Sequence, residues 1–292
     1  MRSLGLFCLI VSLFLFVPPT REHFPGSSPH DETVWFAFQG NESGAFAIEP
    51  IAHVSNGKLI PIPNGCRDKN PEYETFWKTY IAQGRTYEVL FRGGSIGRVS
   101  VPSSVGKFAP YSVEYKGSVP SRGPFEALAT SASDLHDGTL SGPPPDAAEH
   151  RTAVRLAKQL FVQSGVPLKL LARLKVERLT KTTLRPSKYA SLIGSFSITP
   201  EDKPELVHNL FFIATAKTGR YLAEFSRIHV SGGETDNESL AFLDQADLLG
   251  DGKDEVVAEL GLYENNFYCI YKRTADNSHW EQIFEAETSG CE

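Results

Sequence analysis

Short apolar runs separated by turn residues dominate the chain from residue 34 onward, a pattern typical of antiparallel β-structure. Residues 34–38 form one such run, and residues 45–54 form a second. The dipeptide Asn56-Gly57 then separates the second run from residues 59–62. Because a type I′ turn needs positive φ at both central residues, Asn-Gly between two apolar runs predicts a β-hairpin here.

One helix and a second hairpin are expected next. Aromatic and aliphatic side chains recur at helical spacing over residues 72–82, and Gly84 ends the pattern. Residues 86–91 and 96–101 then read as two strands joined at Gly93-Gly94. The sequence therefore predicts an N-terminal β-rich domain with one helix over residues 33–115.

Residues 116–145 are rich in Pro, Gly and Ser and end in Gly-Pro-Pro-Pro. Such a composition buries little apolar surface, so we expect a linker or a long surface loop here. Asp146 is a favourable N-cap for a helix over 147–161, which carries one apolar face. Alternating apolar and basic residues over 168–176 predict a half-buried strand after that helix.

The C-terminal part contains two similar segments. Residues 183–198 align without gaps on 247–262, and each consists of a nine-residue polar loop followed by an apolar strand. Few positions are identical, so chance similarity between two hairpin regions is the alternative. We expect a mainly β fold with a few helices, in which antiparallel sheets form two β-rich domains. Residues 146–292 would form the second domain, a helix plus strands resembling incomplete propeller blades or a β-sandwich.

The amino terminus indicates export. An apolar run of 14 residues, Leu4–Val17, follows one basic residue and precedes two prolines. This run is too short to span a bilayer comfortably and has the length of a signal-peptide core. We therefore expect residues 1–19 to be a signal peptide, a secreted or periplasmic location and no transmembrane helix in the mature chain. A retained N-terminal anchor is the alternative.

Charge and cysteine content limit the partners and the compartment. The net charge is −6 and no long Lys/Arg block occurs, which argues against nucleic acid as a partner. Without the leader, three cysteines remain, namely Cys66, Cys269 and Cys291. Two of the three are expected to pair in an oxidising compartment, and the sequence leaves open which two.

One acidic loop carries candidate metal ligands. Residues 247–256 resemble the cation loop of the FG-GAP/VCBS repeat family, with a degenerate copy at residues 183–191 that has no carboxylate. The resemblance implies a Ca²⁺ site. Its ligands would be the side chains of Asp247, Asp251 and Glu255 and the backbone carbonyl of Lys253.

The loop departs from the family pattern at Leu249, which stands where the family places an acidic ligand. Losing that residue removes one oxygen and one charge, so we expect at most weak Ca²⁺ binding. The alternative is a β-turn whose Asp side chains cap backbone amides without an ion.

Catalytic patterns are weak. Residues 93–97 match Gly-x-Ser-x-Gly, but a strand follows instead of the helix that a hydrolase nucleophile requires, so a hairpin turn is favoured. Three scattered histidines, His208, His229 and His279, are interpreted as surface or structural residues. Glu255 and Glu259 lie on the same face of an expected strand, so they are compatible with the carboxylate pair that glycoside hydrolysis requires.

We therefore expect an exported, non-enzymatic β-rich binding or cell-envelope protein whose extracellular or envelope ligand is unknown. The alternative is a secreted hydrolase that acts on polysaccharide or peptide at a site between the two domains. A binding surface would be aromatic or apolar. Four residues could supply it, although core packing is the commoner fate of such side chains: Tyr263, Phe267, Tyr271 and Trp280.

Overall fold

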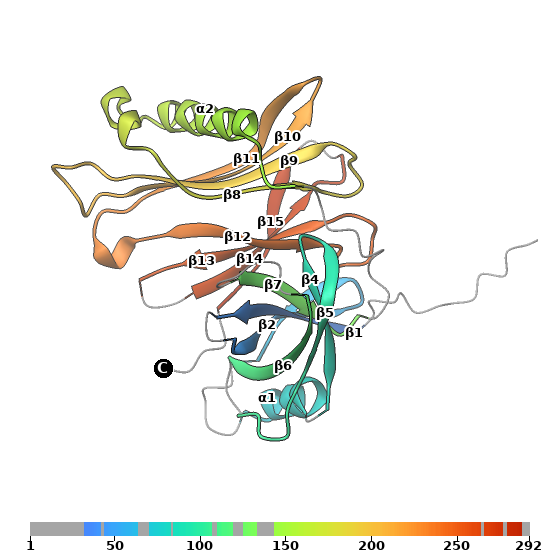
Figure 1. Cartoon of the computed structure of the whole chain (residues 1–292). Helices are drawn as coiled ribbons and strands as arrows, with labels where there is room; N and C mark the ends of the chain where they lie inside the picture. The colour runs from blue at the N-terminus through green and yellow to red at the C-terminus, as the bar shows by residue number, and fades with distance from the viewer. Residues whose placement is uncertain are drawn as a thin grey trace, which may run out of the picture.

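The computed structural model is mainly β, with three antiparallel sheets and few helices, which confirms the expected fold class (Figure 1). The expected signal peptide lies outside the described residues. The structure describes residues 32–41, 44–63, 70–82, 84–106, 110–118, 125–132, 143–263, 266–276 and 279–287.

The N-terminal sheet closes on itself as a barrel. Its strand order is β1-β7-β4-β5-β6-β2-β3, and β1 also pairs with β2, so that only β3 stays outside the ring. Both hairpins expected from sequence are present, β2–β3 and β4–β5. The strands are β1 (Glu32–Gly40), β2 (Phe46–Ser55), β3 (Lys58–Pro61), β4 (Thr86–Phe91), β5 (Gly94–Ser100), β6 (Tyr111–Gly117) and β7 (Phe125–Thr130).

The expected helix is confirmed and closes one side of the barrel core. The helix α1 (Pro71–Phe76) continues as a π-helical turn, Trp77–Ile81, and the Asn70 side chain accepts from the first amides of α1. Tyr73 and Phe76 are buried in the barrel core cluster. Figure 1 shows α1 on the side of the barrel away from the C-terminal sheets.

Part of the expected linker is a strand of the barrel. Within residues 116–145, β7 lies between β1 and β4 and hydrogen-bonds to both. The prediction of a linker is therefore wrong for residues 125–130. The physical reason is that Phe125, Ala127 and Ala129 face the barrel core, and two of these side chains are too small to stand out against a Gly/Pro/Ser-rich background.

The C-terminal part consists of two four-stranded meanders, and the two similar sequence segments occupy matching places in them. The segment after each polar loop is the second strand of its meander, β9 or β13. The first meander contains β8 (Lys175–Thr183), β9 (Ala190–Ile198), β10 (His208–Lys217) and β11 (Arg220–Val230). The second contains β12 (Ser239–Ala246), β13 (Glu255–Gly261), β14 (Asn266–Arg273) and β15 (Trp280–Glu287).

The elements stack in four layers (Figure 1). The helix α2 (Ala147–Gln163) covers the β8–β11 sheet, that sheet lies on the β12–β15 sheet, and the latter lies on the barrel. Asp146 forms a capping box with Glu149 at the start of α2, so the expected helix and its cap are confirmed. Among the described residues, no helix is long and apolar enough to cross a membrane.

The strand expected over residues 168–176 is wrong for residues 168–174. The chain forms a 3₁₀ helix over Leu168–Arg173, and β8 begins only at Lys175. Leu168, Leu171 and Leu174 are three residues apart, the period of a 3₁₀ helix, and the last two pack against the core under α2. The alternation over 168–176 was therefore coincidental, since Leu168 is 72% exposed.

Candidate functional site

The acidic loop between β12 and β13 is a bend whose carboxylates accept backbone amides. Asp247 accepts from the amides of Asp251 (3.0 Å) and Gly252 (2.8 Å). Asp251 accepts from the amide of Lys253 at 3.2 Å. Glu255, which is fully buried, accepts from the amide of Leu248 at 2.8 Å. This capping is what the alternative interpretation of the loop predicts.

A lysine from β14, the second strand after the loop, enters the same loop. Lys272 on β14 places Nζ 2.8 Å from Oδ2 of Asp251 and 2.9 Å from Oε1 of Glu255. Burial raises the pKa of Glu255 to about 7, against the opposing effect of Lys272. Two of the three predicted carboxylate ligands therefore contact one ammonium group. Among the described residues, no group of three or more His, Cys, Asp or Glu side chains is arranged to hold a metal ion.

The acidic loop and its degenerate copy are joined directly. Asp254 is buried, and its Oδ2 accepts from the backbone amide of Arg185 at 2.7 Å. Its Oδ1 accepts from Nε of Arg185 at 2.9 Å, and the amide of Asp254 donates in return to the Arg185 carbonyl at 3.1 Å. These hydrogen bonds between the two loops join the meanders at this end.

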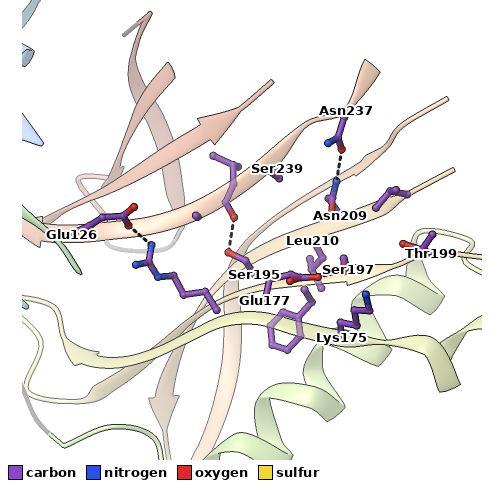
Figure 2. Close-up of a pocket in the computed structure, with 15 residues that line it drawn as sticks. Glu126, Lys175, Glu177, Ser195, Ser197, Thr199, Asn209, Leu210, Asn237 and Ser239 are labelled. Atoms are coloured by element: carbon purple, nitrogen blue, oxygen red, sulfur yellow. Dashed lines mark hydrogen bonds and ion pairs between the residues drawn. The ribbon is translucent and has the colours of Figure 1, made fainter. Parts of the chain in front are cut away.

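A groove opens at the other end of the two stacked sheets (Figure 2). It has a volume of about 560 Å³, within the range of small-ligand and peptide sites. We call it the sandwich groove. It is lined by Glu126, Lys175, Glu177, Arg178, Ser195, Phe196, Ser197, Thr199, Val207, Asn209, Leu210, Asn237, Ser239, Leu240 and Ala241.

One face of the β8–β11 sheet packs on the β12–β15 sheet, and the groove opens where the side chains on that face change from apolar to polar. Further along this face, Ile193 and Phe211 pack on the β12–β15 sheet, whereas Ser195 and Asn209 occupy the same face over the groove. Figure 2 shows Ser195 and Asn209 pointing toward the strand that carries Ser239. The change from apolar to polar side chains therefore marks where the sheets part.

The free edge of β12 runs along this groove. β12 is an edge strand, and its carbonyls on that side are held by side chains instead of by a neighbouring strand. Asn209 Nδ2 donates to the carbonyl of Glu238 at 2.7 Å, and Ser195 Oγ donates to that of Leu240 at 2.5 Å. Arg178 Nη1 donates to the carbonyl of Phe242 at 2.8 Å. These carbonyls belong to alternate residues, as the free edge of a strand requires.

The groove walls carry both signs of charge. Arg178 forms an ion pair with Glu126 at 2.7 Å, and Ser197 donates a hydrogen bond to Glu177. Lys175 adds a second cation. With two cations and two carboxylates, the wall is electrically balanced and suits a ligand that is recognised by hydrogen bonds.

Carboxylates from both β-rich parts meet beside the groove. Glu49 on β2 accepts a hydrogen bond from the Tyr268 hydroxyl at 2.8 Å, and Glu259 lies opposite Tyr268 in the β13–β14 ladder. Burial raises the pKa of Glu49, while burial and then the charges of Glu126 and Glu49 raise the pKa of Glu259. We call Glu49, Glu126 and Glu259 the junction carboxylates.

Other sequence candidates are placed away from the groove. The Gly-x-Ser-x-Gly pattern covers the end of the β4–β5 turn and the start of β5, as the hairpin interpretation expects, and the two turn residues, Arg92 and Gly93, have positive φ. Glu255 and Glu259 are four strand residues, about 13 Å, apart. Glycosidase carboxylates are about 5–9.5 Å apart, so these two do not form such a pair.

The histidines and most of the candidate aromatic residues are structural. His208 is buried, and His229 contacts the carbonyl of Asp236 at 2.9 Å. Tyr271 and Trp280 are buried in the core between the two C-terminal sheets, whereas Tyr263 is 49% exposed. These side chains therefore do not form one exposed aromatic surface.

Of Cys66, Cys269 and Cys291, the structure describes Cys269. Cys269 is buried with a free thiol, and burial raises its pKa to about 12. Cys66 and Cys291 lie outside the described residues, so the expected disulfide stays a prediction.

Sequence reasoning missed the groove residues, because isolated Ser, Asn and Arg residues in strands carry no motif. Lys272 left one weak signal, a lysine in the second apolar run after an acidic loop. No family model, curated protein or solved structure matches the chain, and the likeness of residues 247–256 to the FG-GAP/VCBS loop stays a prediction.

Proposed function

We propose that the chain is an exported binding protein that holds an extended polypeptide in the sandwich groove. The observation that carries this proposal is the free edge of β12 and of the residue before it, where three alternate carbonyls accept hydrogen bonds from side chains of the groove wall. An extended peptide presents backbone amides at the same two-residue spacing. It can replace the side-chain donors and add a strand to β12.

Exchange of donors makes this binding mode feasible. In the unbound protein, Ser195, Asn209 and Arg178 give each of these three carbonyls a hydrogen-bond partner. A peptide amide that replaces a side-chain donor keeps each carbonyl satisfied, and the peptide's own carbonyls can accept from the displaced side chains, so the exchange itself costs little. Affinity would then come from the remaining peptide contacts with the groove walls.

The lining favours a peptide over a sugar or a polyanion. Among the described residues that line the groove, the one aromatic ring, that of Phe196, stacks on Phe212 in the core under α2 and offers no exposed face for a sugar. The balanced charges of the walls give no reason for phosphate binding. Hydroxyl and amide groups of the groove match the hydrogen-bonding capacity of a peptide backbone.

A library of fluorescein-labelled octapeptides tests the proposal by fluorescence anisotropy. We expect at least one peptide family to bind, and Ser239→Trp to weaken its affinity at least tenfold, because Ser239 is exposed and its replacement fills the groove. Leu222→Trp is the matched control, since Leu222 is 50% exposed on β11 outside the lining. Absence of binding, or equal affinity in Ser239→Trp, would contradict the proposal.

The junction carboxylates favour a hydrolase as the second candidate function. A half-buried carboxyl of raised pKa, Glu259, lies near Glu126, which is paired with Arg178, and such unequal environments suit an acid and a nucleophile or base. Turnover of dye-labelled polysaccharide or casein that Glu259→Gln lowers at least 10³-fold would support this candidate. No turnover by the wild-type protein would reject it for those substrates.

A further inference from the structure

The Lys272 ammonium occupies the middle of the acidic loop. It contacts Asp251 and Glu255, the second and third carboxylates of the predicted calcium set, at 2.8 and 2.9 Å. The pairing of β14 with β13 determines this position, because Tyr271 lies opposite Val256 and the next residue of β14 therefore lies beside Glu255. Only 18% of the Lys272 side chain is exposed.

The remaining carboxylate oxygens of the loop are occupied as well. Both oxygens of Asp247, Oδ1 of Asp251 and Oε2 of Glu255 accept backbone amides of the loop itself. A calcium ion needs six to eight oxygens directed at one point. Here the oxygens point at amides and at one ammonium, and Leu249 supplies none. The residues therefore do not fit the ion that the family resemblance implies.

We infer that Lys272 is the internal cation of this loop, replacing Ca²⁺ with an ammonium group supplied by the chain. An ammonium group has three donors and one positive charge, which suffices to hold two carboxylates together without a full coordination shell. The loop conformation would then be independent of calcium. The same would hold for the hydrogen bonds between Asp254 and Arg185.

Thermal unfolding at pH 8 tests the inference on the full mature chain. We expect the wild-type Tm to be the same within about 1 °C in 5 mM EGTA, 5 mM CaCl₂ and 5 mM MgCl₂. Occupancy of even a weak calcium site would raise the Tm by about 1 °C or more. Lys272→Met keeps the length of the side chain and removes its charge. We expect it to lower the Tm by about 3 °C or more in EGTA.

The matched control is Lys188→Met, which removes an exposed lysine from the degenerate copy of the loop and should leave the Tm unchanged. Recovery of the Lys272→Met Tm in CaCl₂, but not in MgCl₂, would further support the inference, because the ion would then replace the missing ammonium. A saturable CaCl₂-dependent rise in the wild-type Tm would overturn it. So would a Lys272→Met protein as stable in EGTA as the wild type. If Lys272→Met does not fold, two measurements still test the inference. The wild-type Tm should be equal in EGTA and in CaCl₂, and Lys272→Arg, which keeps the positive charge, should be as stable in EGTA as in CaCl₂.

Discussion

The backbone amide of Arg92 donates a hydrogen bond to Oδ2 of Asp244 at 2.9 Å, across 152 residues of sequence. Arg92 lies in the β4–β5 turn of the barrel, and Asp244 lies at a bulge in β12. Oδ1 of Asp244 accepts from the amide of Gln245 at 2.8 Å. A single buried carboxylate thus satisfies amides from two layers of the fold and fixes the barrel turn on the second meander.

Asp244 makes stability depend on pH. Burial raises its pKa to about 8, from an ordinary value of about 4. Between these pH values the folded state keeps a proton that the unfolded chain has released, so the free energy of unfolding falls as pH rises. Glu255, with a pKa raised to about 7, acts in the same direction. Burial lowers the pKa of His53 and of His208, and these two act in the opposite direction.

The contribution of Asp244 is therefore measured as a difference between two proteins. We expect urea denaturation midpoints at pH 5 and pH 8 to show a smaller loss of stability with rising pH in Asp244→Asn than in the wild type. Parallel pH profiles for the two proteins would show that Asp244 titrates normally.

The barrel and the second meander share one core, and Leu128 tests it. This side chain is fully buried against the β12–β15 sheet. Replacing it by Ala leaves a cavity, so we expect Leu128→Ala to lose about 2–5 kcal/mol of unfolding free energy in urea denaturation. Ile60→Ala, at a side chain that is 42% exposed, should change stability by no more than about 0.5 kcal/mol. A loss at Leu128 as small as that at Ile60 would mean that this interface is not closely packed in solution.

Two barrel strands approach each other closely at Gly97. A Cβ atom there would lie 2.5 Å from the Lys116 carbonyl oxygen and 2.6 Å from the Gly117 Cα, both backbone atoms of β6. We expect Gly97→Ala to lower the free energy of unfolding by about 1–3 kcal/mol or more, as overpacking does. Gly106→Ala has open space around its Cβ and is the control. Equal chemical denaturation curves for the two variants would contradict the observed strand spacing.

The thiol of Cys269 should be inert in the folded protein. It is buried, and its pKa of about 12 leaves almost no thiolate at pH 8. We expect alkylation by iodoacetamide, measured at the Cys269 peptide by mass spectrometry, to be at least tenfold slower in the native protein than in 6 M urea. Equal rates in both conditions would place this thiol at the surface.

Local structure was largely readable from the sequence where one residue type acts alone. Asn56-Gly57 forms the turn it predicts, with positive φ at both residues, and Asp146 caps the helix it precedes. Local patterns failed where the structure of a segment depends on strands that are distant in sequence. Phe125–Thr130 becomes a barrel strand because β1 and β4 provide partners on both sides, and no feature of the segment itself records those partners.

The sequence by itself determined the β-rich class, the hairpins, the two helices and the matching loop–strand segments, because turn chemistry and hydrophobic period act over a few residues. Only the tertiary structure decided what the functional candidates are. Ser195 meets the carbonyl of Leu240 across 45 residues, and Lys272 meets Asp251 across 21. Such contacts depend on how sheets stack and on strand register, and a periodic pattern along one strand contains neither.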